Sequence, residues 1–411
     1  MKLRCLGDFV ELRQGLAINK GSAHLVSDTQ DITYCYPLLR IADMMDSNFS
    51  KFVSKDVNSS VIANPQDIIY TRTGQIGLAF RGMQGVVHNN SFIVSLKTDE
   101  LEKDYLYTVL NSNFVKKQAN SQAKNSVQPD LTHTMFKSIV IPVPDSREEQ
   151  NRISKIINNI NQKIQTNIQI NQELEAMAKT LYDYWFVQFD FPDQNGKPYK
   201  SSDGKMVYHP ELKREIPEGW EVEKIENIAQ TGSGGTPKST NVSYYSNGEI
   251  PWINSGELEQ TVITSTSNFI TEEGLNNSSA KLFPSGTILV AMYGATAGKV
   301  SFLTFEASTN QAICAIMLTD IRMRYYLKNV IEDLYQYLVK LSTGSARDNL
   351  SQDMIRNIKV VIPSNDILDR FYDFSNNIIK EITKKQQENE QLTQLRDWLL
   401  PMLMNGQVKV G

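Results

Sequence analysis

The chain lacks most of the signals by which a sequence of 411 residues reveals a compartment or a metal. Its three cysteines, Cys5, Cys35 and Cys314, form no CxxC pair, which argues against a zinc site or a disulfide framework. No apolar run approaches the roughly 18–20 residues that cross a bilayer, and the start lacks the apolar core of a signal peptide. We therefore expect a protein of the reducing cytoplasm.

An excess of positive charge is also missing. The net charge is −4; residues 1–145 carry 15 Lys and Arg against 14 Asp and Glu, and residues 220–364 carry 11 against 14. Domains that bind nucleic acids are usually basic. Binding of DNA by either segment therefore requires positive charge that is concentrated on one face or supplied by a partner.

Motifs of catalysis are absent as well. The sequence has no GxxxxGK[ST] phosphate loop, no HExxH zinc pair, no GxSxG nucleophile turn and no [DNS]PP[YF] string to hold the target amine of an amino-methyltransferase. A nuclease-like set can be assembled from Pro192, Asp193, Glu211 and Lys213, but this segment has no strand pattern. We therefore predict no catalytic residue and no metal ligand.

What the chain does contain is an internal repeat with a period of about 219 residues. Residues 126–144 align without a gap on residues 345–363, and each copy is followed by a long amphipathic segment. Solenoid repeats are much shorter, about 20–50 residues. The pattern predicts a duplicated domain pair with internal pseudo-twofold symmetry.

Long helices are predicted over 146–186 and 364–406. Ser146 and Glu149 have the spacing of a capping box, and apolar residues then follow the 4-3 spacing of coiled coils in both segments. About 40 residues at 1.5 Å each make a rod of about 60 Å, so we expect an antiparallel pair rather than two helices that each pack on their own domain. Two equivalent polar positions in these seams are predicted to set the helix register: Asn171 and Asn389.

The segments before the helices have short β-branched runs interrupted by glycine, as in 67–82 and 286–303, and helical stretches follow at 100–118 and 321–341. Strands and helices without regular βαβ alternation indicate an α+β fold. The predicted fold class is two pseudo-symmetric α+β domains separated by two long antiparallel coiled-coil helices. Residues 187–219, rich in Pro, Gly, Asp and Ser, are predicted to be a linker.

Loops around the repeat carry the residue types that read DNA, because Arg suits the guanine edge, Asn and Gln suit adenine, and Lys and Arg suit phosphates. The base-reading candidates are Arg72, Thr73, Gln75, Arg81, Asn89 and Asn90 in the first copy, and Trp252, Asn254, Tyr293, Lys299, Asn310 and Gln311 in the second. The phosphate candidates are Lys20, Lys51, Lys116, Lys117, Lys124, Lys238 and Arg347. For each one alone a solvated polar side chain is the simpler interpretation, so the prediction depends on the collective pattern.

Several strings resemble the specificity subunit of type I restriction–modification systems, over essentially the whole chain. They are NQELEAMAKTLYDYWFVQFDFP (171–192) followed by NGKPYKSSDGKMVYHPELKREIPEGW (195–220), NEQLTQLRDWLLPMLMNG (389–406), GTP…IPWINSGEL (235–258) and STNQAICAI (308–316). The first copy departs further from these strings. There, Leu38 replaces Trp252, and His88-Asn89-Asn90 replaces Thr309-Asn310-Gln311.

The resemblance implies target recognition domains at 1–145 and 220–363, conserved spacer helices at 146–186 and 364–406, and a linker at 187–219. Each domain would read one half of a bipartite double-stranded DNA target. The helices would dock two methyltransferase subunits, through which two restriction subunits join. The chain itself would be non-catalytic, because S-adenosylmethionine, ATP and Mg²⁺ belong to those partners. Two other interpretations stay open: a stand-alone DNA nuclease or methyltransferase, and a coiled-coil adaptor without DNA binding.

Overall fold

The computed structural model describes residues 1–123, 129–341, 350–404 and 406–408. Contacts divide the chain into two compact units: unit 1 is residues 1–165 with 390–411, and unit 2 is residues 166–389. Each unit holds one globular domain, here the first or the second domain, and a part of both long helices, α5 (Arg147–Tyr182) and α10 (Asn365–Met404). The compact units thus cut across both helices, whereas the predicted domains keep each helix whole.

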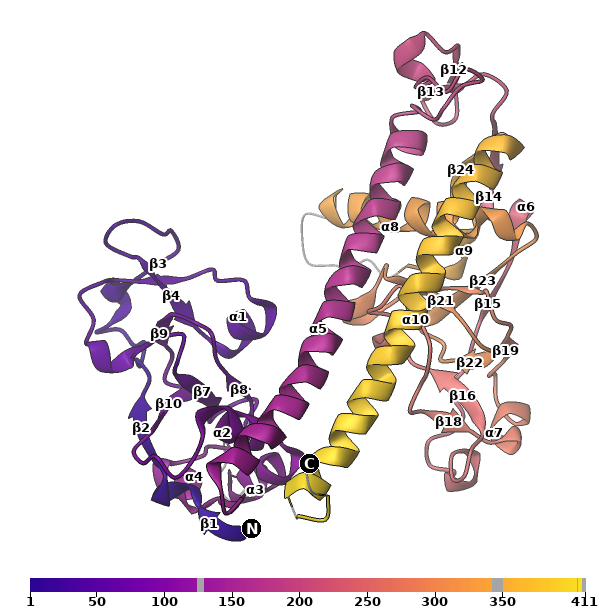
Figure 1. The fold of residues 1–411 in the computed structure, drawn as a ribbon. Coiled ribbons are helices and arrows are strands. Elements are labelled where there is room, and N and C mark those ends of the chain that lie inside the picture. Colours follow the sequence, from indigo (N-terminus) through magenta and orange to yellow (C-terminus); the bar gives the residue numbers. More distant parts are fainter. Residues whose placement is uncertain (124–128, 342–349, 405, 409–411) are drawn as a thin grey trace. The chain divides into compact units, whose positions relative to one another are not determined.

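The first domain mixes sheets and helices (Figure 1). Its central antiparallel sheet has the order β2-β10-β7-β8, from β2 (Val10–Gln14), β10 (Ser91–Leu96), β7 (Ile68–Thr71) and β8 (Ala79–Phe80). A second sheet has the order β3-β5-β4-β9-β6, from β3 (Val26–Ser27), β5 (Phe52–Val53), β4 (Tyr36–Leu39), β9 (Gly85–Val87) and β6 (Ile62–Ala63). A separate pair is β1 (Lys2–Cys5) with β11 (Val140–Val143). The helices are α1 (Ile41–Asp46), α2 (Lys103–Leu110), α3 (Asn113–Ala123) and α4 (His133–Ser138).

The second domain has the same plan, with one strand more in its central sheet and one strand fewer in its second sheet. That sheet has the order β15-β23-β20-β21-β17, from β15 (Ala229–Ser233), β23 (Ile313–Leu318), β20 (Ile288–Ala291), β21 (Val300–Leu303) and β17 (Val262–Ile263). The second sheet has the order β18-β16-β22-β19, from β18 (Phe269–Ile270), β16 (Ile250–Ile253), β22 (Ala307–Thr309) and β19 (Leu282–Phe283). A separate pair is β14 (Glu221–Lys224) with β24 (Lys359–Ile362). The helices are α6 (Ile225–Ile228), α7 (Glu272–Asn276), α8 (Arg324–Leu341) and α9 (Gln352–Arg356).

Strand registers confirm the internal repeat. Cys5 faces Val140 in the β1–β11 pair, and the aligned residues Lys224 and Lys359 face each other in β14–β24. Both domains also contain a parallel pair in their second sheet, β4 with β9 and β16 with β22. In these pairs Leu38 occupies the place of Trp252, as the sequence alignment predicts. The predicted α+β fold class is therefore confirmed, and so is the duplication.

The helices of the two domains differ where the sequence predicts the same element. The stretch 100–118 forms two helices, α2 and α3, because Ser112 starts a new helix: its buried Oγ accepts a hydrogen bond from the Val115 amide at 3.2 Å. Serine side chains compete with the helical backbone in this way. In the second domain the corresponding stretch is the single helix α8.

The long helices pair with each other in both units. In unit 2, Asn167 bonds to Asn389 and Asn171 to Ile382, so that numbers rise along α5 while they fall along α10. In unit 1, Arg396 of α10 bonds to Asn161 of α5 at 3.1 Å. In each unit the two helices therefore lie side by side and antiparallel (Figure 1), as predicted.

Helix α5 begins as its sequence indicates. The Oγ atom of Ser146 accepts a hydrogen bond from the Glu149 amide at 3.2 Å, which satisfies one of the free donors of the first turn. After Tyr182 the helix continues as one π-helical turn, Asp183–Val187. Helix α10 carries Pro401 inside its last turns and ends at Met404.

The segment 187–219, which the sequence predicts to be a linker, has ordered structure of its own. Phe191 stacks between Tyr199 and Trp220, with ring centroids 4.6 Å and 4.9 Å away, and is almost fully buried. The carboxylate of Asp190 accepts hydrogen bonds from the amide and hydroxyl of Ser201 at 2.7 Å and 2.6 Å. A hairpin follows, formed by β12 (Met206–His209) and β13 (Arg214–Pro217). The aromatic residues of this Pro- and Gly-rich stretch were the sequence signal that could have indicated a buried cluster.

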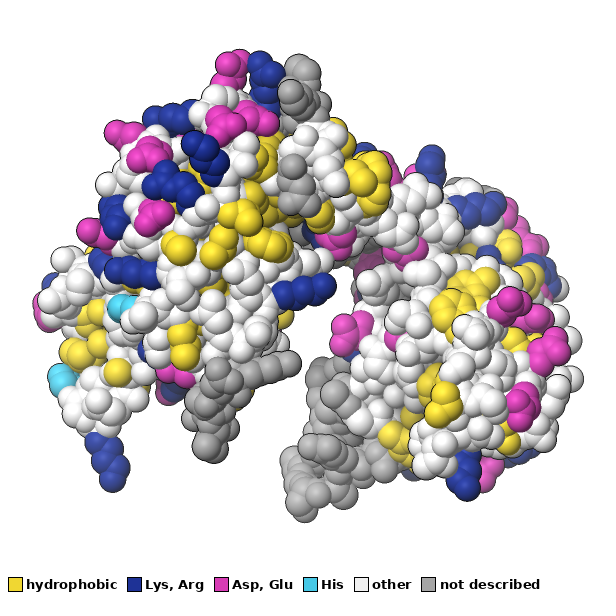
Figure 2. Space-filling view, turned by 90° about the horizontal axis from the view of Figure 1, so that it is seen from below, with side chains coloured by type: hydrophobic (Ala, Val, Ile, Leu, Met, Phe, Trp, Pro, Cys, Tyr) yellow, Lys and Arg dark blue, Asp and Glu magenta, His cyan; other side chains and the backbone are white. Residues whose placement is uncertain are grey.

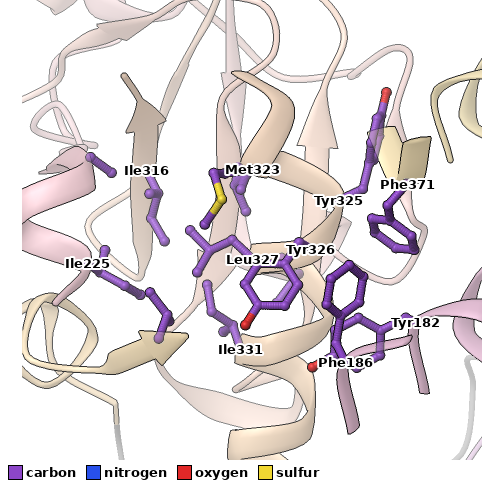
Figure 3. Close-up of a cluster of buried hydrophobic side chains, with 14 of the residues drawn as sticks. Tyr182, Phe186, Ile225, Ile316, Met323, Tyr325, Tyr326, Leu327, Ile331 and Phe371 are labelled. Carbon is purple, nitrogen blue, oxygen red and sulfur yellow. The ribbon is translucent and has the colours of Figure 1, made fainter. Parts of the chain in front are cut away.

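This segment joins the largest core of unit 2, seen in part in Figure 3. Phe186, just beyond α5, points toward Tyr326 of α8 and Phe371 of α10, at centroid distances of 4.7 Å and 4.9 Å. Aromatic side chains bury much apolar surface and dominate such cores. The end of α5, the start of α10 and the second domain are therefore packed as one body.

Candidate nucleic-acid interface

Arg72, the leading base-reading candidate of the first domain, lies directly after β7 and is mostly buried. Its Nη2 donates to the carboxylate of Asp130, and its guanidinium lies over the Phe92 ring, 5.3 Å from the centroid. Only 19% of its side chain is exposed. Its backbone amide donates to Asn90 at 2.8 Å, and its carbonyl accepts from Leu131 at 3.0 Å. In this structure, Arg72 is thus a paired residue that supports the loop before α4.

The second domain places a methionine at the same backbone position. The amide of Met292 donates to Ala312 at 2.8 Å, and its carbonyl accepts from Leu350 at 3.0 Å, which repeats the two backbone bonds of Arg72. The Met292 side chain is 3% exposed and belongs to the domain core. One fold thus carries a charged group at this position in one domain and an apolar group in the other.

A polar cluster surrounds Arg72. The Nε2 of Gln14 donates to the carbonyl of Asn89 at 2.9 Å, and the Oε1 of Gln14 lies 3.2 Å from His133 Nε2. Burial, and then the charges of Arg72 and Lys137, lower the pKa of His133. The imidazole of His133 also packs edge-on against the Phe92 ring.

Burial likewise lowers the pKa of His88, whose Nδ1 accepts from the Asn90 amide at 3.4 Å. The structure therefore brings the candidates Arg72, Asn89 and Asn90 together. Gln14, His88, Asp130 and His133 belong to the same cluster, and they were missed as candidates. Asp130 and His133 lie within the repeated stretch 126–144, and this position was the sequence signal that could have identified them as candidates.

The remaining candidates of the first domain differ in their surroundings. Arg81 and Lys51 are paired, with Asp104 and Asp28 respectively, and Arg81 also lies over the Tyr107 ring. Lys116 is half-buried and lines a hollow together with Asn161 of α5 and Arg396 of α10. Burial, and then the charge of Arg396, lower the pKa of Lys116. Thr73 is partly buried, and its amide donates to the Asn90 carbonyl at 3.4 Å. The exposed candidates are Lys20, Gln75 and Lys117. Lys124 lies outside the described residues.

In the second domain four of the candidates gather around the turn at Gly234 and Gly235: Trp252, Asn254, Asn310 and Gln311. The indole Nε1 of Trp252 donates to the Gly235 carbonyl at 3.0 Å, and the Gly235 amide donates to the Thr309 carbonyl at 2.9 Å. A Cβ atom on Gly234 would lie 2.0 Å from that same carbonyl oxygen, so only glycine fits. Trp252 therefore stabilises this turn through the hydrogen bond of its indole.

Three amide candidates extend this cluster. Asn310 donates to Asn254 Oδ1 at 3.4 Å, and its own Oδ1 accepts from the Ala312 amide at 3.1 Å. Gln311 is exposed and accepts a hydrogen bond from Thr236 Oγ1. The exposed candidates that complete the domain are Lys238, Tyr293 and Lys299. Arg347 lies outside the described residues.

A surface hollow of about 520 Å³ opens beside this cluster. It is lined by the aromatic side chains Tyr245, Trp252 and Phe269 and by the amides Asn247 and Asn268. Aromatic faces and amides are the groups that stack on bases and bond to their edges. On the face of the molecule seen in Figure 2, Lys and Arg are interspersed with Asp and Glu within each unit, rather than gathered into one basic surface.

The helix seam contains a buried polar node. Asn167 is fully buried, and its Nδ2 donates to Asn389 Oδ1 at 2.9 Å and to Glu388 Oε2 at 2.8 Å. Asn171, the equivalent of Asn389 in the sequence, instead donates to the Ile382 carbonyl at 3.5 Å. The partner of Asn389 in the seam is thus Asn167.

The nuclease-like set is not gathered in space into a catalytic arrangement. Asp193 caps a turn, accepting from the amides of Asn195 and Lys197 at 2.8 Å, and Glu211 pairs with Lys359 at 3.0 Å. Among the described residues there is no group of three or more His, Cys, Asp or Glu placed to hold a metal ion. No helix within the described ranges is long and apolar enough to cross a membrane. Burial raises the pKa of the Cys314 thiol to about 12, so this cysteine is not a reactive thiolate.

Two copies of one α+β domain, each packed with parts of two antiparallel helices, define a duplicated two-domain protein. The family model described as the type I restriction modification DNA specificity domain matches residues 1–176 and 217–394, and the chain belongs to this family.

Relatives of the chain carry matching descriptions. The MjaIX specificity subunit of a type I restriction enzyme from Methanocaldococcus jannaschii is 26% identical over 348 residues, which cover 84% of this chain and 78% of that protein. The HindI specificity subunit from Haemophilus influenzae is 26% identical over 377 residues, covering 79% and 81%. The fold is similar to that of the S subunit of a type I system from M. genitalium, with a TM-score of 0.58 at 14% identity, over 98% of this chain and 95% of that one.

Proposed function

We propose that this chain is the DNA-recognition subunit of a type I restriction–modification complex in the cytoplasm. The first and second domains each read one half of a bipartite double-stranded target, and the paired helices set the number of unread base pairs between the halves. The observation that carries this proposal is the duplication itself: one reading fold occurs twice in a chain whose long helices pair antiparallel within each unit.

The two half-sites differ in sequence under this proposal. Arg72 in the first domain and Met292 in the second occupy one backbone position, and Leu38 and Trp252 occupy another. Leu38 and Met292 are buried and Arg72 is mostly buried, so these differences act through the loops that the side chains support. Domains with different loops present different patterns of donors and apolar contacts to a base pair. The exposed candidates Lys20, Gln75, Lys117, Lys238, Tyr293, Lys299 and Gln311 are proposed to contact the duplex.

Catalysis belongs to partner subunits in this proposal. Methylation of a base requires that the base be flipped out of the duplex into a pocket with its own chemistry. In line with the family resemblance, S-adenosylmethionine, ATP and Mg²⁺ are proposed to bind to partner subunits, which are two methyltransferase and two restriction subunits. Exposed apolar side chains on α5 and α10 support docking of the methyltransferase subunits on the helices, among them Met177, Leu395 and Trp398, which are 55%, 45% and 58% exposed.

The experiment that tests the proposal changes the length of the helix pair. Inserting seven residues after Gln165 and seven after Asn389 preserves the heptad seam and lengthens each helix by about 10 Å. At 3.4 Å per base pair, the spacer between half-sites should grow by about three base pairs. Sequencing of methylated sites, in cells that also express the methyltransferase subunit, measures both the spacer and the half-site bases.

Unchanged half-sites with a longer spacer support the proposal. Altered half-site bases with the original spacer would contradict it, and so would methyl transfer by the purified chain alone with S-adenosylmethionine.

A further inference from the structure

A single amide on α10 binds the outer edge of the second domain's central sheet. The Nε2 atom of Gln386 donates to the carbonyl of Val262 and to Thr264 Oγ1, both at 3.0 Å. Val262 belongs to β17, the terminal strand of this sheet. The side chain of Gln386 therefore connects the middle of α10 to the second domain inside unit 2.

The strand geometry shows why this bond is needed. The amides of Phe302 and Thr304 donate to the carbonyls of Thr261 and Ile263, at 2.8 Å and 3.2 Å. Carbonyls of successive residues in a strand point in opposite directions, so the carbonyl of Val262 points away from the sheet. Val262 is fully buried, and a buried carbonyl requires a donor. Gln386 supplies that donor.

The first copy of the long helix carries no equivalent donor. Aligning Ser146 with Ser364 and Asn171 with Asn389 places Ile168 of α5 opposite Gln386 of α10. Ile168 is 39% exposed and its side chain has no donor. Among the described residues, the central sheet of the first domain ends at β8, without a counterpart of β17. Both the donor and the strand that it binds therefore differ between the two copies.

Gln386 lies close to the buried polar node of the helix seam. It lies three residues before Asn389, whose side chain joins Asn167 in the buried node of the seam. The orientation of the second domain is therefore bound to α10 at the level where the two helices are held in register.

We propose that Gln386 is a positioning residue that fixes the second domain on the helix pair and so determines how strictly the spacer length is enforced. This inference rests on the proposed function. Loss of the donor should leave the bases of both half-sites unchanged, while the β17 edge of the second domain's central sheet gains freedom to shift against α10. The protein should then lose about tenfold of its discrimination between the normal spacer and one that is a base pair longer or shorter, which corresponds to about 1.4 kcal/mol.

The test compares four substitutions in the full chain, expressed with the methyltransferase subunit. Gln386→Glu keeps the shape and removes the donor, and Gln386→Met removes it without adding charge. Gln386→Lys keeps a donor and should retain the strict spacer. Gln387→Glu makes the same charge change at the adjacent exposed glutamine and serves as the matched control. Methylated sites are sequenced, and initial methylation rates are measured on duplexes that differ only in spacer length.

The expected result is methylation at neighbouring spacer lengths with Glu or Met at position 386, and at the normal length alone with Lys at 386 or Glu at 387. The same single spacer in all variants overturns the inference, as does a change in half-site bases. Loss of all methylation by both Gln386→Glu and Gln386→Met, with unchanged melting temperatures, also overturns it. A wild-type chain that yields no bipartite methylated motif would refute the proposed function instead.

Discussion

The two domains of this chain share a backbone fold and differ in the side chains at equivalent positions. Their central sheets have the same strand order up to β8 and β21, and their terminal pairs have the same register. Yet Arg72 with Asp130 in the first domain corresponds to the buried Met292 in the second. In the part of the chain that the structure describes, the edge strand β17 has no counterpart in the first domain. Backbone hydrogen bonds therefore define the shared fold, while side chains at equivalent positions are free to diverge.

The two units also differ in how their helix segments are packed. In unit 2 the end of α5 continues into the aromatic core around Phe186, whereas in unit 1 the cluster formed with the helices contains Ile153, Ile157, Leu400 and Leu403. Four substitutions test these differences between the domains and between the units, with expected effects that decrease from the first to the last.

The largest effect is expected for Phe186→Ala. Its ring is 4% exposed and packs on Tyr326 and Phe371, so truncation should cost about 3–5 kcal/mol of unfolding free energy in unit 2. Denaturant unfolding followed by near-ultraviolet circular dichroism measures it. The control is Tyr184→Ala, at a side chain that is 38% exposed, with an expected cost near 0.5 kcal/mol. Equal costs for both variants would contradict the assigned core.

The next effect concerns the contrast between Arg72 and Met292. Arg72→Met gives the first domain the residue of the second but leaves Asp130 without its partner, at a cost of about 2 kcal/mol. Adding Asp130→Asn should recover part of that stability. Specificity should change in the first half-site alone, as methylated-site sequencing will show. A uniform loss of methylation at all sequences would indicate that Arg72 contributes only to general DNA binding.

A smaller effect is expected in the helix seam, where Asn171 and Asn389 are equivalent in sequence but not in contacts. Asn167→Leu removes the partner of Asn389 and should cost about 1 kcal/mol, because Glu388 can still reach solvent. Asn171→Leu, which loses only one hydrogen bond of 3.5 Å, should cost less. Thermal unfolding of both variants measures the difference. A larger cost for Asn171→Leu would mean that it, rather than Asn167, sets the register.

The smallest effect is a pH dependence carried by His133. Its pKa is lowered in the folded chain, so the unfolded chain binds the proton more readily. Its contribution to stability is therefore complete at neutral pH and is lost as the pH falls below the ordinary histidine pKa. His133→Gln introduces the residue found at the equivalent Gln352 and should reduce the stability lost between pH 7 and pH 5.5. An identical pH profile for the variant and the wild type would show that His133 does not contribute to the pH dependence of stability.

Sequence reasoning predicted the repeat, the α+β class and the paired helices, because each depends on patterns that persist over many residues. It assigned Arg72, Asn89 and Asn90 to the loops around the repeat, together with Thr73, Gln75 and Arg81, but did not predict that Asp130 would pair with Arg72. It also treated residues 187–219 as a linker, since aromatic residues without a period carry no strand or helix signal. Their burial depends on Trp220 and on the end of α5, which only the folded chain brings together.

The sequence alone shows that one fold occurs twice and that each copy ends in a long amphipathic helix, because both patterns persist over many residues. Three contacts could be identified only from the folded structure: Asn389 with Asn167, Gln386 with the edge of β17, and Arg72 with Asp130. These contacts join residues far apart in sequence, and their partners depend on strand order and helix register, which no local pattern specifies.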